Sequence, residues 1–142
     1  MKKLFQVVVV FMVMFSFIGI SFAEEWSKEK NDKFDKSWQT YLAPIKTKFM
    51  KCANDEDVVC MDNLLTQNMS RLKMFKDDTE RKEIYCFTLG YLAQIRQAGM
   101  GQAAQMMKQN RAYYFRERYI QVMATFEVQK CSSVLPSKEK GE

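Results

Sequence analysis

Four cysteines carry the clearest chemical signal in this chain. Seven, 25 and 44 residues separate them in turn, and the chain contains no histidine. Zinc sites usually place cysteines about two to four residues apart and often add histidine. An even number of widely spaced cysteines instead favours disulfide bonds in an oxidising compartment. We therefore predict two disulfides and no metal or other cofactor, with the bonds made by Cys52, Cys60, Cys86 and Cys131.

Catalytic chemistry has few candidates here. Without histidine, the usual serine and cysteine triads lack their base, and no Cys-x-x-Cys pair suggests thiol–disulfide exchange. Two acidic clusters, residues 55–57 and 77–80, contain enough carboxylates for glycoside hydrolysis. Both clusters stand where helices are expected to begin, however, and acidic side chains stabilise that end of a helix. The sequence predicts a protein that is not an enzyme.

Two segments are candidate binding faces for a protein partner, and the second of them could also bind an anionic lipid or a glycan. The acidic turn at residues 54–57 lies between the first two cysteines, so a bond between them would clamp it. The segment from Arg111 to Tyr119 is the densest mixture of aromatic and basic side chains, and tyrosine and arginine are favoured anchors of protein interfaces. The candidate partner-binding residues are Asp55, Glu56, Asp57, Arg111, Tyr114 and Arg118.

The first 23 residues have the pattern of a secretory signal peptide. Lys2 and Lys3 precede an apolar run of about 17 residues, and Ser21-Phe22-Ala23 supplies small residues at a cleavage site. Acidic residues follow directly instead of a basic stop-transfer cluster. We predict cleavage after Ala23, a periplasmic or secreted protein, and no stable membrane insertion after cleavage.

The mature chain is one domain of modest size. Removing 23 of 142 residues leaves 119, and removing the two signal lysines leaves 20 basic against 17 acidic residues, a net charge of about +3. This charge is too small to indicate nucleic acid as a partner. The predicted domain covers residues 24–131, and the polar tail at residues 132–142, which contains Pro136, is expected to be flexible.

Apolar periodicity predicts helices throughout the mature chain. One stripe runs over residues 26–49 and contains Pro44, which should end or kink its helix. A second helix should start with Asn54 or Asp55 as its cap and reach about residue 76. Asp77 and Glu80 have capping-box spacing for a third helix, which should end at Gly99-Met100-Gly101. A last helix over residues 102–130 completes a predicted all-α bundle of four or five helices.

The lengths of these helices constrain the disulfide pairing. We favour Cys52 with Cys60 and Cys86 with Cys131. Cys86 would then lie about 20 Å from the glycines, and Cys131 about 45 Å beyond them, if both helices were straight. The two Cα atoms must come within about 7 Å. Either the last helix breaks near residues 114–119, or the pairs are Cys52–Cys131 with Cys60–Cys86, or Cys52–Cys86 with Cys60–Cys131.

The cysteines also carry a resemblance to a known family. The run Cys86-Phe-Thr-Leu-Gly90-Tyr91-Leu92, and a closing helix from Tyr119 to Cys131, resemble the small periplasmic four-cysteine immunity proteins of type VI secretion amidase effectors. The resemblance covers about residues 52–131. It implies a helical inhibitor that plugs the active cleft of a toxin, and it carries over no individual binding residue.

Two functions are compatible with these observations. The first is an inhibitor or immunity protein that binds a toxin or hydrolase as its protein partner. The alternative is a periplasmic chaperone or an accessory subunit of an envelope assembly, because aromatic and methionine side chains on the helical stripes can serve as adaptable binding surfaces. The sequence leaves open whether the protein forms a homodimer.

Overall fold

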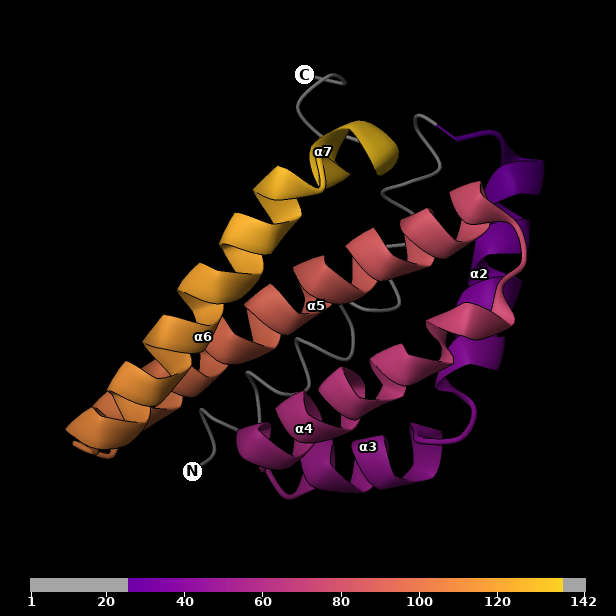
Figure 1. The fold of residues 1–142 in the computed structure, drawn as a ribbon. Coiled ribbons are helices and arrows are strands. Elements are labelled where there is room, and N and C mark those ends of the chain that lie inside the picture. The colour runs from indigo at the N-terminus through magenta and orange to yellow at the C-terminus, as the bar shows by residue number, and fades with distance from the viewer. Residues whose placement is uncertain (1–25, 137–142) are drawn as a thin grey trace.

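A computed structural model describes residues 26–136 of the chain, and the predicted signal peptide lies outside these residues (Figure 1). The described part contains six α-helices, one 3-10 helix and no β-strand, which confirms the predicted all-α class. The elements are α2 (Lys28–Leu42), α3 (Lys46–Asn54), α4 (Val58–Asn68), the 3-10 helix η1 (Met69–Met74), α5 (Asp78–Gln105), α6 (Gln109–Val128) and α7 (Cys131–Val134).

Pro44 divides the first predicted helix in two. The chain leaves α2 at Leu42 and resumes as α3 at Lys46, because proline has no backbone N–H to donate and its ring crowds the preceding turn. The predicted break is therefore confirmed. This division and the short α7 raise the number of α-helices above the four or five expected.

The cap of α4 is Asp57, so the prediction of Asn54 or Asp55 was wrong. The Asp57 carboxylate accepts a hydrogen bond from the backbone N–H of Cys60 (3.0 Å). Asn54 is instead the last residue of α3, and Asp55 follows it as the C-terminal cap. Asn54 and Asp55 form the end of α3, so they cannot also start α4. The N-terminal cap of α4 is therefore two to three residues later than expected.

Asp77 caps α5 as predicted. Its carboxylate accepts hydrogen bonds from the backbone N–H groups of Thr79 (2.8 Å) and Glu80 (3.1 Å). The Glu80 carboxylate accepts from the hydroxyl of Ser37 on α2 (2.7 Å). The start of α5 is thus joined to α2 as well as capped.

The third helix does not end at the glycines, which corrects our prediction. α5 continues through Gly99 and Gly101 to Gln105. A Cβ atom built on Gly99 would lie 2.7 Å from ring carbons of Phe115 on α6. Gly99 therefore allows two helices to approach closely, and it does not act as a helix stop.

The true turn between the two long helices resolves the disulfide question. It lies near Met107, so Cys86 and Cys131 are about 30 Å and about 35 Å from it along their helices. These two distances are similar, so the two cysteines come to lie side by side. Their Cα atoms are 5.3 Å apart without any break in α6. The predicted break near residues 114–119 was wrong, and the favoured pairing is confirmed.

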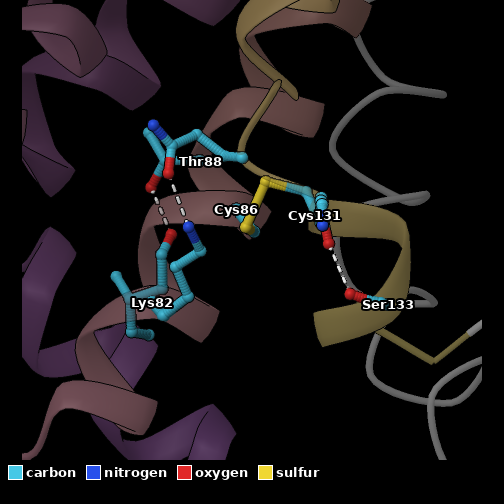
Figure 2. The surroundings of a disulfide bond; sticks show 8 residues. Lys82, Cys86, Thr88, Cys131 and Ser133 are labelled. Carbon is cyan, nitrogen blue, oxygen red and sulfur yellow. Dashed lines mark hydrogen bonds between the residues drawn. A yellow bond between two sulfur atoms is a disulfide. The ribbon is translucent and has the colours of Figure 1, made fainter. Parts of the chain in front are cut away.

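Both disulfides join neighbouring elements. The Cys52–Cys60 bond links α3 to α4, with Cα atoms 5.9 Å apart. Figure 2 shows the Cys86–Cys131 bond joining α5 to the start of α7, where the Ser133 hydroxyl donates to the Lys130 carbonyl oxygen (2.7 Å). The ordered chain thus extends past Cys131, and Leu135 packs against the core. Residues 137–142 of the predicted tail lie outside the described residues.

Helix α5 organises the core because it contacts α2, α4, α6 and α7. In Figure 1 it begins beside α2 and ends at the opposite end of the molecule, where α6 begins and turns back along it. The largest side chains of the α2 region, Trp38 and Tyr41, form an aromatic cluster with Phe87 of α5. Of the helices described, none has the length and hydropathy needed to cross a membrane.

Candidate protein-binding surface

A buried ion cluster connects α4, α5 and α6. Asp62 of α4 is only 1% exposed, and it pairs with Arg96 of α5 (2.8 Å) and Arg118 of α6 (2.9 Å). Arg96 also donates to the backbone carbonyl of Arg118 (2.9 Å). The cluster therefore sets the positions of three helices relative to one another.

The two guanidinium groups keep Asp62 ionised. Burial alone would raise the pKa of this carboxyl, but hydrogen bonds from Arg96 and Arg118 and the two positive charges outweigh burial, so the pKa is lowered. The hydrogen bond to Asp62 raises the pKa of Arg118 in turn. Sequence reasoning missed Asp62 and Arg96. The sequence did contain a signal for this pair. Asp62 and Arg96 carry opposite charges, and each interrupts the apolar stripe of its own helix.

Arg118 also orders an exposed aromatic ring. Its guanidinium lies 5.2 Å from the centroid of the Tyr114 ring, within the range of a cation–π interaction. Tyr114 packs edge-on against the buried Phe115 and remains 41% exposed. Of these two candidate residues, Arg118 is engaged in the ion cluster, and Tyr114 presents its ring to solvent.

The acidic turn is held rigidly by bonds at each side. The Cys52–Cys60 disulfide spans it, and the backbone N–H of Asp57 donates to the Cys52 carbonyl (2.8 Å). The side-chain amide of Gln102 on α5 donates to the Glu56 carbonyl (3.0 Å). The turn is thus fixed both to its own helices and to the end of α5.

The carboxylates of the turn have different roles. Asp57 uses its carboxylate to cap α4. Within the described part of the chain, the carboxylates of Asp55 and Glu56 form no hydrogen bond or ion pair with another residue. These two side chains are available to a partner, although all three were predicted as candidates together.

The acidic turn and the start of α6 lie at one end of the molecule. α4 and α6 both begin there and α5 ends there, as Figure 1 shows, and the Gln102–Glu56 hydrogen bond joins the parts. The turn between α5 and α6 adds two exposed methionines, Met106 (47%) and Met107 (88%). We call this the end surface, and its residues are Asp55, Glu56, Met106, Met107, Arg111 and Tyr114.

The end surface presents groups that suit protein recognition. It combines free carboxylates, the exposed guanidinium of Arg111, an aromatic ring and flexible thioethers. Residues 26–136 contain no group of three or more cysteine, aspartate or glutamate side chains placed to hold a metal ion.

A cleft of about 340 Å³ lies at the opposite end, between α2 and the start of α5. Two of its carboxylates are already engaged, since Lys30 contacts Glu83 (2.9 Å) and the Ser37 hydroxyl donates to Glu80 (2.7 Å). These contacts join α2 to the start of α5.

Comparison with family models, curated proteins and solved structures found no match to this chain. The fold defines the protein as a small all-α domain stapled by two disulfides.

Proposed function

We propose that the protein acts in the periplasm or outside the cell as a non-enzymatic inhibitor, and that it binds a toxin or hydrolase through the end surface. The signal-peptide pattern and the two disulfides support an oxidising compartment. The resemblance to immunity proteins of amidase effectors supports the inhibitor role.

The observation that carries this proposal is the backbone conformation of two residues of the end surface. Glu56 (φ 59°) and Met107 (φ 55°) are left-handed, although glycine is the residue that adopts this conformation without strain. Each occupies the position just after a helix end. In both cases the residue and the one that follows it donate to carbonyls of the last helical turn, in the pattern of a Schellman motif.

Glycine at these two positions would satisfy the same hydrogen bonds at lower cost. A left-handed non-glycine residue costs about 1–2 kcal/mol. Glu56 and Met107 lie on the same end of the molecule. Met107 is 88% exposed, and the partly buried Glu56 has no partner for its carboxylate among the described residues, so no charge interaction within the domain offsets this cost. A role in binding explains why side chains stand there.

Rigidity makes the end surface suitable for tight inhibition. The Cys52–Cys60 disulfide and the Gln102 hydrogen bond fix the acidic turn. The ion pair with Asp62 fixes the guanidinium of Arg118, which stacks on the ring of Tyr114. A surface that is already ordered loses little conformational entropy when it binds. Few contacts can therefore yield a stable complex.

A second function has its own supporting observation. Exposed apolar side chains also lie on α6 away from the end surface, and they include Ile120 (49%) and Val128 (77%). Exposed apolar surface is what a periplasmic chaperone or an accessory subunit of an envelope assembly uses to hold its clients. Suppression of the aggregation of unrelated proteins would favour this alternative.

The test is a capture experiment with tagged protein that has been expressed from Met1 and exported. The wild type should retain one dominant, stoichiometric partner from an envelope extract. The double variant Glu56→Gly/Met107→Gly keeps the backbone conformation and removes both side chains, so it should lose that partner.

Lys130→Gly is the matched control, because Lys130 (φ 54°) has the same conformation at the far end of α6. It should capture the partner as the wild type does. Retention of the same partner by the double variant would contradict the proposal, and so would capture of many weak partners without a dominant one.

A further inference from the structure

The outer face of α6 combines exposed apolar and charged side chains in a pattern that is complementary to itself. Ile120 (49% exposed) and Met123 (37% exposed) lie on neighbouring turns of this face. Arg116 is exposed on the turn before them and Glu127 on the turn after them. We call these four residues the α6 stripe.

The charges of the α6 stripe have no partner within one copy of the chain. Arg116 and Glu127 are eleven positions apart, about 16 Å along a helix, so they cannot reach each other. No ion pair or hydrogen bond engages either side chain in the part of the chain that the structure describes. In Figure 1, α6 runs along the edge of the molecule opposite to α2, which leaves this helix open to a neighbour.

We propose that the α6 stripe is the contact between two copies of this chain, with the two α6 helices antiparallel about a two-fold axis. In a two-fold contact, both copies use the same patch. For two antiparallel helices, the residue numbers of the two members of each facing pair therefore add up to the same total. Arg116 with Glu127, and Ile120 with Met123, share the same midpoint between residues 121 and 122.

One register therefore satisfies every member of the stripe. Each Arg116 faces the second copy's Glu127, which forms two ion pairs at the ends of the contact. Each Ile120 faces the second copy's Met123 at its centre, where apolar side chains exclude water. The charged pair and the apolar pair share one centre, between residues 121 and 122. Binding of a different protein would not require this shared centre, which therefore identifies a second copy of the chain as the occupant.

The stripe lies apart from the end surface on the same helix. Arg111 and Arg118 are on the flank of α6 that faces α4, as the pairing of Arg118 with Asp62 shows, and Arg116 and Ile120 point away from it. The contact thus leaves the end surface of each copy open. The dimer is independent of the proposed inhibitor function, because it can be measured without any partner.

The test is sedimentation velocity with the full-length chain expressed from Met1, over about 1 to 500 µM, because a contact built on one helix pair lies at the lower end of interface sizes. The wild type should change from monomer to dimer within this range. Arg116→Glu and Glu127→Arg should each weaken the dimer at least about tenfold, because like charges then face each other twice.

The double variant Arg116→Glu/Glu127→Arg restores opposite charges in the same register and should regain the dimer. Arg111→Glu makes the same charge change on the other flank of α6 and should leave the dimer as it is. All these positions are exposed, so unchanged circular dichroism will show that the variants fold. A wild type that stays monomeric at the highest concentration overturns the proposal. Single variants that dimerise normally, or a double variant that does not recover, also overturn it.

Discussion

The ring of Phe115 packs directly on the backbone of Gly99, at a place where a Cβ atom would lie 2.7 Å from the ring. Phe115 is fully buried between α5 and α6. This contact determines how closely the two longest helices approach, and with it the position of the Cys86–Cys131 disulfide at their far end.

Replacing Gly99 with alanine should destabilise the protein. The added methyl group must displace a rigid, buried ring, which typically costs about 1–3 kcal/mol and outweighs the gain in helix propensity of up to about 1 kcal/mol. Urea unfolding followed by circular dichroism measures the change. Gly101→Ala is the matched control, because nothing lies within 4 Å of its added Cβ, and it should leave stability unchanged or raise it. Equal effects of the two substitutions would contradict the packing role of Gly99.

Local patterns in the sequence predicted most helices, and non-local contacts explain the errors. The Asp77 cap and the break at Pro44 depend on residues within one or two turns, so both were found. Glycine often ends a helix, and this rule led to a wrong end for α5. The deciding contact for Gly99 comes from Phe115, sixteen residues later, and only the folded arrangement reveals it.

The candidate site was predicted less completely. The acidic turn and the start of α6 were identified separately, and the sequence did not indicate that they share one end of the molecule. Their proximity depends on where α5 ends, and the predicted end of α5 was too early in the chain. The Asp62–Arg96 pair was not anticipated either, because its partners lie on different helices and no local rule connects them.

Substituting Asp62 with asparagine should cause a large loss of stability. The change keeps the side-chain shape but leaves the Arg96 and Arg118 charges without their counter-ion, and breaking a buried pair in this way costs about 3–5 kcal/mol. Asp78→Asn breaks an exposed pair with Arg81 and should cost less than about 1 kcal/mol. Thermal unfolding of both variants gives the comparison. A loss below about 1 kcal/mol for Asp62→Asn would show that the cluster contributes little.

Acid should weaken the protein partly through Asp62. The pKa of this group is lowered in the folded protein from its usual value of 3.8, so the unfolded chain binds more protons near that pH. The contribution is complete above about pH 4 and is lost as the pH falls through the lowered pKa. Urea midpoints should therefore fall more steeply from about pH 4 to pH 2 in the wild type than in Asp62→Asn. Parallel curves would contradict this.

The two disulfides should differ in both accessibility and contribution. Cys86 and Cys131 are fully buried, whereas Cys52 and Cys60 are partly exposed, so mild thiol treatment should open the Cys52–Cys60 bond first. Timed alkylation and peptide mass spectrometry will show the order. The serine double variants should lose about 4 kcal/mol for Cys86–Cys131 and about 2.5 kcal/mol for Cys52–Cys60, because the loops span 45 and 8 residues. The reverse order of reduction would contradict the burial argument.

Glycine substitutions can separate stability from binding at the end surface. Glu56→Gly or Met107→Gly relieves a left-handed conformation that costs about 1–2 kcal/mol, and the greater freedom of glycine in the unfolded chain offsets part of this gain. We expect the free energy of unfolding to stay constant or rise by up to about 1 kcal/mol, while partner capture is lost. Glu56→Ala keeps the strain and should not be stabilised. If glycine destabilised the protein, the two side chains would have a structural role, and the conformational argument for the binding surface would fail.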